Sequence, residues 1–261
     1  MMNQRKRWWF IFYQNKIVIE QTNEGLYTIP HLLDMPLPKP PVEHIHEFTF
    51  QEYEPCIAFE LSELPPLMSS YSLVGLRDSY DYLAQTQYLA AGYASQLIYW
   101  DKTSCFCPVC GTEPKRKALN MKKCPHCQKE LYPPVQTAVI VLIQKGEDIL
   151  LAHAHNFKAE FYSLIAGFVE IGETLEEAVQ REVKEETGLA IQNIRYFGSQ
   201  PWPYPSGLMV GFVADYKSGE IKLQEEELRS AAFYSKENLP TLPQKLSIAR
   251  RLIDWWLAKK Q

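Results

Sequence analysis

The sequence predicts an α+β protein in which a mixed β-sheet lies between helices, preceded by a small cysteine-rich module and by a separate N-terminal α/β domain. Three observations carry this prediction. Strand-like and helical segments occur on both sides of two Cys-x-x-Cys pairs, and a glutamate-rich amphipathic helix follows the second group of strands. A chain of 261 residues also has enough apolar side chains for more than one core. The expected domains are residues 1–102, 103–131 and 132–261.

The N-terminal domain is predicted from short apolar runs separated by turn residues. Strands are expected at residues 8–13, 16–20, 45–50 and 56–61, a proline-rich connector at 36–41 and a helix at 78–100. His44 and His46 lie on one face of a predicted strand with no other catalytic residue type nearby, and we expect them and His31 to be structural.

Charge and the apolar runs exclude several classes of protein. The net charge of −4 gives no general attraction to nucleic acid. The first apolar run, residues 8–13, follows Arg5, Lys6 and Arg7 but is shorter than the roughly 7–15 residues of a secretion signal. No run approaches the ~20 apolar residues of a membrane span. We therefore expect a cytoplasmic protein.

Two cysteine pairs, Cys107 with Cys110 and Cys124 with Cys127, have the spacing of a four-thiolate zinc ribbon. The alternatives are a disulfide, which the cytosol disfavours, and a thioredoxin-like redox motif, which would require a βαβ context. Zn²⁺ is the expected structural ion; Cys105 and Cys56 are left over. The lysines and arginine of this module are either a nucleic-acid contact or solvated charge: Lys115, Arg116, Lys117, Lys122 and Lys123.

The C-terminal domain is predicted from β-branched and apolar runs. Strands or extended segments are expected at residues 137–143, 149–152, 161–165, 194–197, 208–216 and 231–234, with a closing helix at 244–260. A mixed sheet between two helices follows from this order.

A second helix in this domain, rich in glutamate, is predicted from residues that typically start and end a helix. Thr174 and Glu177 form a capping box, and Gly188 is placed for a left-handed C-terminal cap, which predicts a helix over residues 175–187. At ~100° per residue, Glu182 and Glu186 fall inside the arc of apolar side chains, with Glu185 at its edge.

Such a carboxylate cluster is costly when buried. Two carboxylates ~6 Å apart repel by roughly 3 kcal/mol at an effective dielectric constant of ~20, and desolvation adds to this cost. Either the group is protonated or a cation neutralises it, and Mg²⁺ or Mn²⁺ prefers oxygen ligands of this kind. A solvated glutamate-rich helix is the plain alternative, and the phase of the glutamates argues against it.

The segment from residue 167 to 189 resembles the Nudix box, GX5EX7REUXEEXGU with U aliphatic. Its nine fixed positions are matched by Gly167, Glu173, Arg181, Glu182, Val183, Glu185, Glu186, Gly188 and Leu189. The resemblance implies an αβα sandwich and a hydrolase that cleaves a nucleoside diphosphate linked to another group. It also indicates that Glu173 and Arg181 form an internal ion pair.

A second segment indicates which branch of the Nudix family the chain resembles. Three alternating prolines predict a stiff, extended path that holds Gln200 and Trp202 at the mouth of a site, whereas a loop that only fills a core is the alternative. With the box and the cysteine pairs, it resembles the SQPWPFPxS array of the NADH pyrophosphatase branch of the Nudix family. Tyr204 replaces phenylalanine, and Gly207 replaces the final serine. The matching segment is Ser199, Gln200, Pro201, Trp202, Pro203, Tyr204, Pro205, Ser206 and Gly207.

The branch resemblance implies roles for individual residues. Catalysis is assigned to Glu182, Glu185 and Glu186, which with Glu227 and the Ala166 carbonyl would hold Mg²⁺ or Mn²⁺. Substrate-binding roles fall on the segment from Gln200 to Gly207 and on four further residues: Tyr132 and Phe168, which would sandwich the nicotinamide ring, Ala249 through its backbone, and Arg77, for which an ordinary surface arginine is the alternative.

The function implied is metal-dependent hydrolysis of NADH or NAD⁺ to nicotinamide mononucleotide and AMP, by a homodimer. Removal of 5′ NAD caps from RNA uses the same chemistry and remains an alternative main role. A nucleotide sensor without activity is a third hypothesis, and it conflicts with the complete set of box glutamates. ADP-ribose as substrate is disfavoured by the SQPWP segment.

Overall fold

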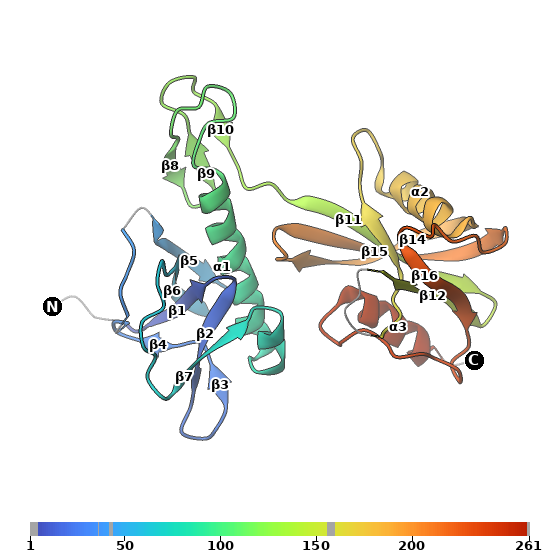
Figure 1. The fold of residues 1–261 in the computed structure, drawn as a ribbon, viewed down its shortest axis with the longest axis horizontal. Coiled ribbons are helices and arrows are strands. Elements are labelled where there is room, and N and C mark those ends of the chain that lie inside the picture. Colours follow the sequence, from blue (N-terminus) through green and yellow to red (C-terminus); the bar gives the residue numbers. More distant parts are fainter. Residues whose placement is uncertain (1–4, 36, 42–43, 156–159, 260–261) are drawn as a thin grey trace. The chain divides into compact units, whose positions relative to one another are not determined.

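The structure is a computed structural model that describes residues 5–35, 37–41, 44–155 and 160–259 (Figure 1). It divides into two compact units. Unit 1 comprises Met1–Pro134 with Pro203–Ser206, and unit 2 comprises Val135–Trp202 with Gly207–Gln261. Pro36 of the predicted connector and Lys260 of the predicted closing helix lie outside the described residues. No helix among the described residues is long and apolar enough to cross a membrane.

Unit 1 contains a seven-stranded mixed sheet. Its strands are β1 (Arg7–Tyr13), β2 (Lys16–Gln21), β3 (Tyr27–Thr28), β4 (His31–Leu32), β5 (His46–Phe50), β6 (Tyr53–Glu60) and β7 (Tyr71–Gly75). The predicted β1–β2 hairpin is present, and β1 runs parallel to β6 in the centre of the order β3-β2-β1-β6-β5. The predicted strands of this domain are therefore confirmed, and β3, β4 and β7 are additional.

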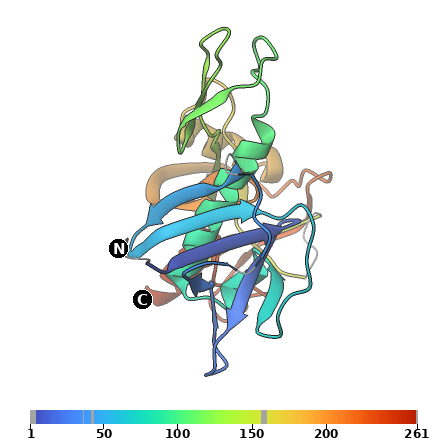
Figure 2. The ribbon, with the colours of Figure 1, turned by 90° about the vertical axis from the view of Figure 1, so that its left-hand side faces the viewer.

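One long helix, α1 (Gln85–Thr103), covers this sheet (Figure 2). The helix predicted at residues 78–100 is wrong at its start, because Asp78–Asp81 forms a separate 3-10 turn. On the sheet face toward α1, Phe10 contacts Phe48, whose ring lies 5.2 Å from that of Tyr93 on the helix. The helix is thus fixed to the sheet by aromatic packing.

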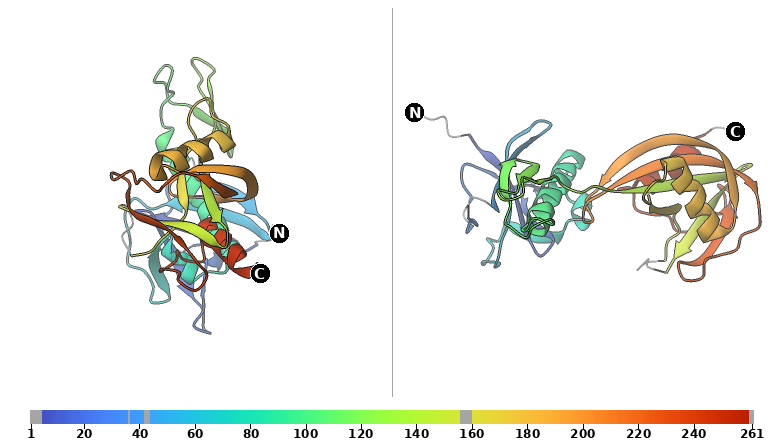
Figure 3. Two further views of the ribbon diagram at one scale, coloured as in Figure 1. Left: turned by 90° about the vertical axis from the view of Figure 1, so that its right-hand side faces the viewer. Right: turned by 90° about the horizontal axis from the view of Figure 1, so that it is seen from above.

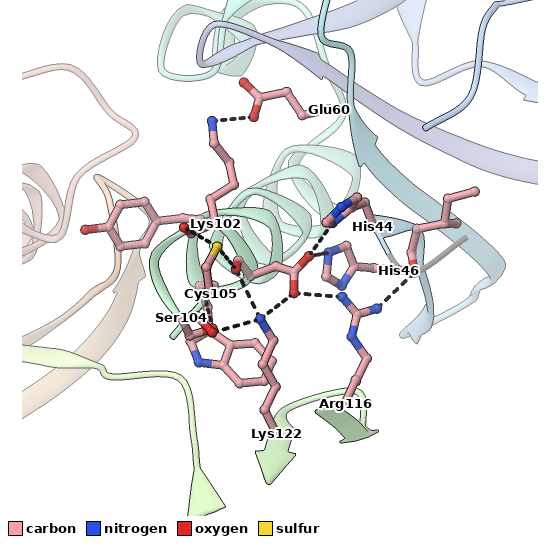
Figure 4. A network of polar contacts seen from close by, with 12 residues as sticks. His44, His46, Glu60, Lys102, Ser104, Cys105, Arg116 and Lys122 are labelled. Carbon is pink, nitrogen blue, oxygen red and sulfur yellow. Dashed lines mark hydrogen bonds and ion pairs between the residues drawn. The ribbon is translucent and has the colours of Figure 1, made fainter. Parts of the chain in front are cut away.

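A three-stranded sheet follows α1, with β8 (Lys115–Ala118), β9 (Met121–Lys123) and β10 (Glu130–Leu131). Two of its cations reach the end of α1, where they form ion pairs with Asp101 (Figure 4). The Lys122 Nζ lies 2.7 Å from Asp101 Oδ1 and also donates to the Asp101 and Ser104 carbonyls. Arg116 lies 2.9 Å from the same carboxylate oxygen. Lys122 thereby caps the helix with positive charge at its negative end.

The two histidines of this region belong to the same network. His44 Nδ1 lies 3.4 Å and His46 Nε2 lies 3.8 Å from Asp101 Oδ2. Burial and the adjacent Arg116 lower the pKa of His46 to about 4, so its ring is neutral at physiological pH. Burial opposes ionisation of Asp101, but hydrogen bonds from Lys122 and Arg116 hold its pKa at about 2. These contacts agree with the structural role expected for the histidines.

Replacing Asp101 by asparagine is expected to destabilise unit 1 by about 3 kcal/mol, because the buried Lys122 and the partly buried Arg116 lose their counter-charge. Urea unfolding, with hydrogen exchange at the last turn of α1, measures the effect. Glu60→Gln is the matched control: Glu60 pairs with the exposed Lys102, and such a pair contributes at most about 1 kcal/mol. Equal small effects of both substitutions would contradict a role for Asp101 in fixing the cysteine-rich module.

Unit 2 contains a six-stranded mixed sheet of order β14-β15-β11-β12-β16, with β13 paired to β11. Its strands are β11 (Gln136–Lys145), β12 (Asp148–Ala154), β13 (Ile165–Phe168), β14 (Ala190–Trp202), β15 (Gly207–Ser218) and β16 (Leu228–Tyr234). The β11–β15 pair is parallel and the other pairs are antiparallel. The mixed sheet that the sequence predicts is therefore confirmed.

Two helices, α2 (Leu175–Thr187) and α3 (Ile248–Ala258), cover opposite faces of this sheet (Figure 3). Along β11, Val139 and Val141 pack in the core with α2, whereas Ile140 and Leu142 pack in the core with α3. This alternation produces the expected αβα sandwich. The predicted start of the closing helix at Gln244 is wrong, because the Ser247 side chain caps a helix that begins at Ile248.

The proline-rich segment forms a hairpin and not the extended path that was predicted. β14 remains extended through Pro201 and Trp202, a turn occupies Pro203–Ser206, and β15 begins at Gly207. Pro201 is accommodated because β14 is at the edge of the sheet. The turn itself belongs to unit 1.

Candidate active site and metal centres

The glutamate-rich helix α2 forms where its end signals predict. The Thr174 hydroxyl accepts a hydrogen bond from the Glu177 amide, and the Glu177 carboxylate accepts one from the Thr174 amide. Gly188 ends the helix in the left-handed conformation with φ of 71°. Both ends are therefore fixed by local contacts, which sets the rotation of the glutamates about the helix axis.

The glutamates differ in burial as the helical wheel indicates. Glu186 is 5% exposed, the Glu182 side chain is mostly buried, and the Glu185 side chain is half exposed. The Glu182 carboxylate lies against the backbone of Gly167 on β13, where a Cβ atom would stand 1.9 Å from Glu182 Cδ. Glycine is thus required at this position by the approach of the carboxylate.

Arg181 connects the loop before α2 to the carboxylates. Its guanidinium donates to both oxygens of Glu173, at 2.6 and 3.0 Å, and to the Phe168 carbonyl at 2.9 Å. It also donates to Glu182 and Glu185, at 2.9 and 3.0 Å. The expected Glu173–Arg181 pair is therefore present, within a network that fixes three glutamates and the end of β13.

The charge of a fourth carboxylate, Glu227 in the segment before β16, acts on these glutamates. Backbone amides of Lys222 and Gln224 donate to the Thr187 and Glu186 carbonyls, which holds this segment along the end of α2. Burial, together with the charges of Glu182, Glu227 and Glu185, raises the pKa of Glu186 to about 8. Burial also raises the pKa of Glu182, to which Glu227 contributes. The charges of Glu182, Glu185 and Glu227 thus all act on the buried Glu186.

This donor set fits a hard divalent cation. All its side-chain donors are carboxylate oxygens, which Mg²⁺ and Mn²⁺ prefer. Burial is the largest cause of the raised pKa of Glu186, and the charges of the neighbouring carboxylates add to it. Arg181 contacts two of these carboxylates, Glu182 and Glu185. Divalent cations supply the charge that would allow all of the carboxylates to ionise.

The raised pKa of Glu186 predicts how stability depends on pH without divalent ions. The pKa is about 8 in the folded chain against 4.5 for the free side chain, so folding is favoured by the protonated form. Stability of unit 2 is therefore expected to fall between about pH 4.5 and 8, by a few kcal/mol at ~1.4 kcal/mol per pKa unit. Unfolding in EDTA across this range, compared with Glu186→Gln, measures the difference, and parallel profiles would contradict the prediction.

Two other predicted residues in unit 2 adjoin the glutamates, whereas Gln200 and Ala249 have contacts elsewhere. Ala166 and Phe168 flank Gly167 on β13, and the Phe168 side chain is 61% exposed. Gln200 donates to the Leu246 carbonyl at 2.7 Å and so holds the segment before α3. Ala249 is buried in the core on the α3 face, opposite to α2. The structure therefore separates Ala249 from the carboxylate cluster.

The predicted residues in unit 1 form a second group. The Tyr204 hydroxyl lies 2.5 Å from that of Tyr88 on α1, and the charge of Arg77 acts on both phenols. Ser206 donates to the Pro134 carbonyl. Tyr132 is 58% exposed, with its hydroxyl bonded to Glu130. The charge of Arg77 thus acts on Tyr204, while Tyr132 lies beyond β10 in the segment that leads to unit 2.

The four predicted zinc ligands converge. The Sγ atoms of Cys107, Cys110, Cys124 and Cys127 all lie within 4.8 Å of one another. Tetrahedral coordination at ~2.3 Å requires sulfur atoms ~3.8 Å apart, so this cluster is consistent with structural zinc. The Val109 amide lowers the pKa of the Cys107 thiol, which favours the thiolate. Cys105 bonds to helix carbonyls and is outside the cluster, as is the buried Cys56.

Cys124→Ser is expected to remove bound zinc and to lower the melting temperature, because the module has little apolar core of its own. Metal analysis and thermal unfolding measure the two effects. Cys105→Ser is the matched control, since it removes a thiol two residues before the first pair. A Cys124→Ser protein with unchanged zinc content would refute the assignment.

One feature of unit 2 was missed by the sequence analysis. A cavity of about 550 Å³ that is largely open to solvent is lined by His155, Leu223, Glu225, Leu228 and Arg229. Its residues come from two segments about seventy positions apart, so no spacing in the sequence connects them. Glu227 lies within the second of these segments, which places the cavity beside the carboxylate cluster.

Comparison with known proteins gives matches over both units. The NUDIX domain family matches residues 133–256, and the NADH pyrophosphatase-like rudimentary NUDIX domain matches residues 6–100. The NAD-capped RNA hydrolase NudC of Pseudomonas aeruginosa is 41% identical over 208 residues, which cover 79% of this chain and 74% of the relative. The protein of the same name from Haemophilus influenzae is 48% identical over 163 residues, 60% of this chain and 62% of the relative.

A solved structure supports the fold. A NUDIX hydrolase from Nitrosomonas europaea superposes with a TM-score of 0.50 at 22% identity, covering 58% of this chain and 89% of that one. At this identity the similarity concerns the fold alone.

Proposed function

The chain belongs to the Nudix hydrolase family, and on this basis we propose that it hydrolyses the diphosphate bond of NADH and NAD⁺ to nicotinamide mononucleotide and AMP. The observation that carries the proposal is the carboxylate cluster on α2, in which Glu186 is buried beside Glu182 and Glu227. The N-terminal match to an NADH pyrophosphatase-like domain supports NAD(H) as the substrate.

The residues have separate roles in this proposal. Glu182, Glu185, Glu186 and Glu227, with the Ala166 carbonyl, would hold Mg²⁺ or Mn²⁺. When bound, these ions supply a Lewis acid for a phosphoryl oxygen and a bound water of lowered pKa. Arg181 keeps Glu182 and the Phe168 carbonyl in fixed positions. The exposed Phe168 ring supplies a flat face for the nicotinamide. A role for Tyr132 at the nicotinamide stays a prediction from the resemblance.

Removal of 5′ NAD caps from RNA is the second candidate function, supported by the names of the relatives in Pseudomonas and Haemophilus. The test is a side-by-side measurement of kcat/KM on NADH and on NAD-capped RNA with Mg²⁺ or Mn²⁺. Release of AMP from NADH is expected. Strong preference for the free dinucleotide would argue against RNA as the main substrate, and no hydrolysis of either would refute the proposed chemistry.

A homodimer and a cytoplasmic location complete the proposal. The dimer is proposed from the resemblance to the NADH pyrophosphatase branch, and the location is the one expected from the sequence. Light scattering of the purified protein tests the dimer: a mass of one chain would refute it.

A further inference from the structure

We infer that the cavity lined by His155, Glu225 and Arg229 binds the phosphodiester that follows the NAD cap of an RNA, and so favours capped RNA over free NADH. The inference rests on the proposed function, since it assigns a subsite next to that active site. Its starting point is the position of the cavity. The His155 amide donates to the Glu227 carbonyl at 2.9 Å, and Arg229 is two residues beyond Glu227.

The polar groups of the cavity suit a phosphate. Arg229 Nε donates to His155 Nδ1 at 3.3 Å. An imidazole that accepts at Nδ1 in its neutral form carries its hydrogen on Nε2, so this ring offers a donor beside the guanidinium. The Arg229 side chain is 48% exposed, and its nearest carboxylate in an ion pair is the exposed Glu160, at 4.0 Å. A cation and a neutral donor are therefore accessible from solvent at one place.

The remaining lining suits a ribonucleotide. The Glu225 carboxylate is an acceptor, which a phosphate would not use but a ribose hydroxyl would. Leu223 and Leu228 supply apolar surface that packs into the core under α2. Donors for a phosphate, an acceptor for a sugar hydroxyl and an apolar wall thus lie around one space of about 550 Å³.

Free NADH and NAD-capped RNA differ in the number of phosphate groups that the protein can bind. Free NADH has two phosphoryl groups, and both belong to the diphosphate that the glutamates and their cations would bind. A third anionic group near the adenosine exists in capped RNA, as the 3′ phosphodiester. With the nicotinamide at Phe168, the inference places the adenosine end of the substrate toward Glu227. Arg229 would then have no phosphate to bind in NADH and one to bind in capped RNA.

The test compares Arg229→Gln with the wild-type protein on NADH and on an NAD-capped ten-nucleotide RNA. The ratio of kcat/KM on RNA to that on NADH is expected to fall about tenfold, the effect of one charge-assisted hydrogen bond. The slope of log kcat/KM for RNA against log salt should become shallower by about 0.7. Arg229→Lys should recover part of the ratio. Lys217→Gln, which removes an exposed charge outside the cavity lining, is the matched control and should leave the ratio unchanged.

Two outcomes would overturn the inference: an unchanged ratio in Arg229→Gln, or an equal loss on both substrates. A wild-type protein that hydrolyses neither NADH nor capped RNA would overturn the proposed function itself.

Discussion

Glu186→Gln is expected to lower kcat on NADH by about 10³-fold while leaving the fold intact. Glutamine keeps the volume of the side chain but removes a charged metal ligand. Loss of a cation that stabilises the transition state by several kcal/mol costs a factor of ten for every ~1.4 kcal/mol. The fold should tolerate the change because burial and neighbouring carboxylates already disfavour the ionised form of Glu186. Steady-state kinetics with saturating Mg²⁺ or Mn²⁺ measure the loss.

Glu176→Gln is the control for this experiment. Glu176 lies on the exposed face of the same helix, and its replacement removes the same charge without touching the cluster. Its kcat should stay within about twofold of the wild-type value. Near-normal turnover of Glu186→Gln, or an equal loss in both variants, would refute the proposed metal role.

Gly167→Ala is expected to lower kcat/KM by about 10²-fold. A Cβ atom at this position would stand 1.9 to 2.3 Å from three atoms of the Glu182 carboxylate, so the carboxylate must move by an ångström or more. Displacements of this size in a catalytic group cost about two orders of magnitude in rate. The effect is measured with NADH as substrate, and the metal dependence should shift to higher concentrations.

Gly198→Ala provides the comparison for this substitution. Gly198 is on β14 of the same unit, and the nearest described atom to its Cβ would be 3.9 Å away, on Arg251. Activity should therefore be unchanged. If Gly167→Ala loses melting temperature in proportion to activity, the loss reflects unfolding and not a displaced Glu182 carboxylate.

Local signals made the helix of the candidate site predictable. The capping box, the C-terminal glycine and the phase of the glutamates are contained within residues 174–188, and the structure has the helix at the predicted limits. The zinc cluster is equally local, since each cysteine pair forms one turn. The mixed sheet followed from apolar runs whose length and order allow few arrangements.

Long-range contacts were not predictable in the same way. Lys122 and Arg116 meet Asp101 and His46 only after folding, and their spacing in the sequence carries no sign of it. The segment after Gln200 was assigned from its prolines, which restrict φ but do not determine where a turn occurs. The roles of Gln200 toward Leu246 and of Ala249 in the core of the opposite face depend on the register of β14 and on α3.

The contacts at the tip of the β14–β15 hairpin determine whether a fragment of this protein can replace the whole chain in assays. A Cβ atom on Gly92 of α1 would stand 3.0 Å from Pro203, and Tyr88 shares a hydrogen bond with Tyr204. In a fragment of residues 135–261, Pro203 and Tyr204 would lack the α1 residues that they contact in the whole chain. An excised hydrolase fragment is therefore a poor surrogate for the whole chain, and assays should begin with the intact polypeptide.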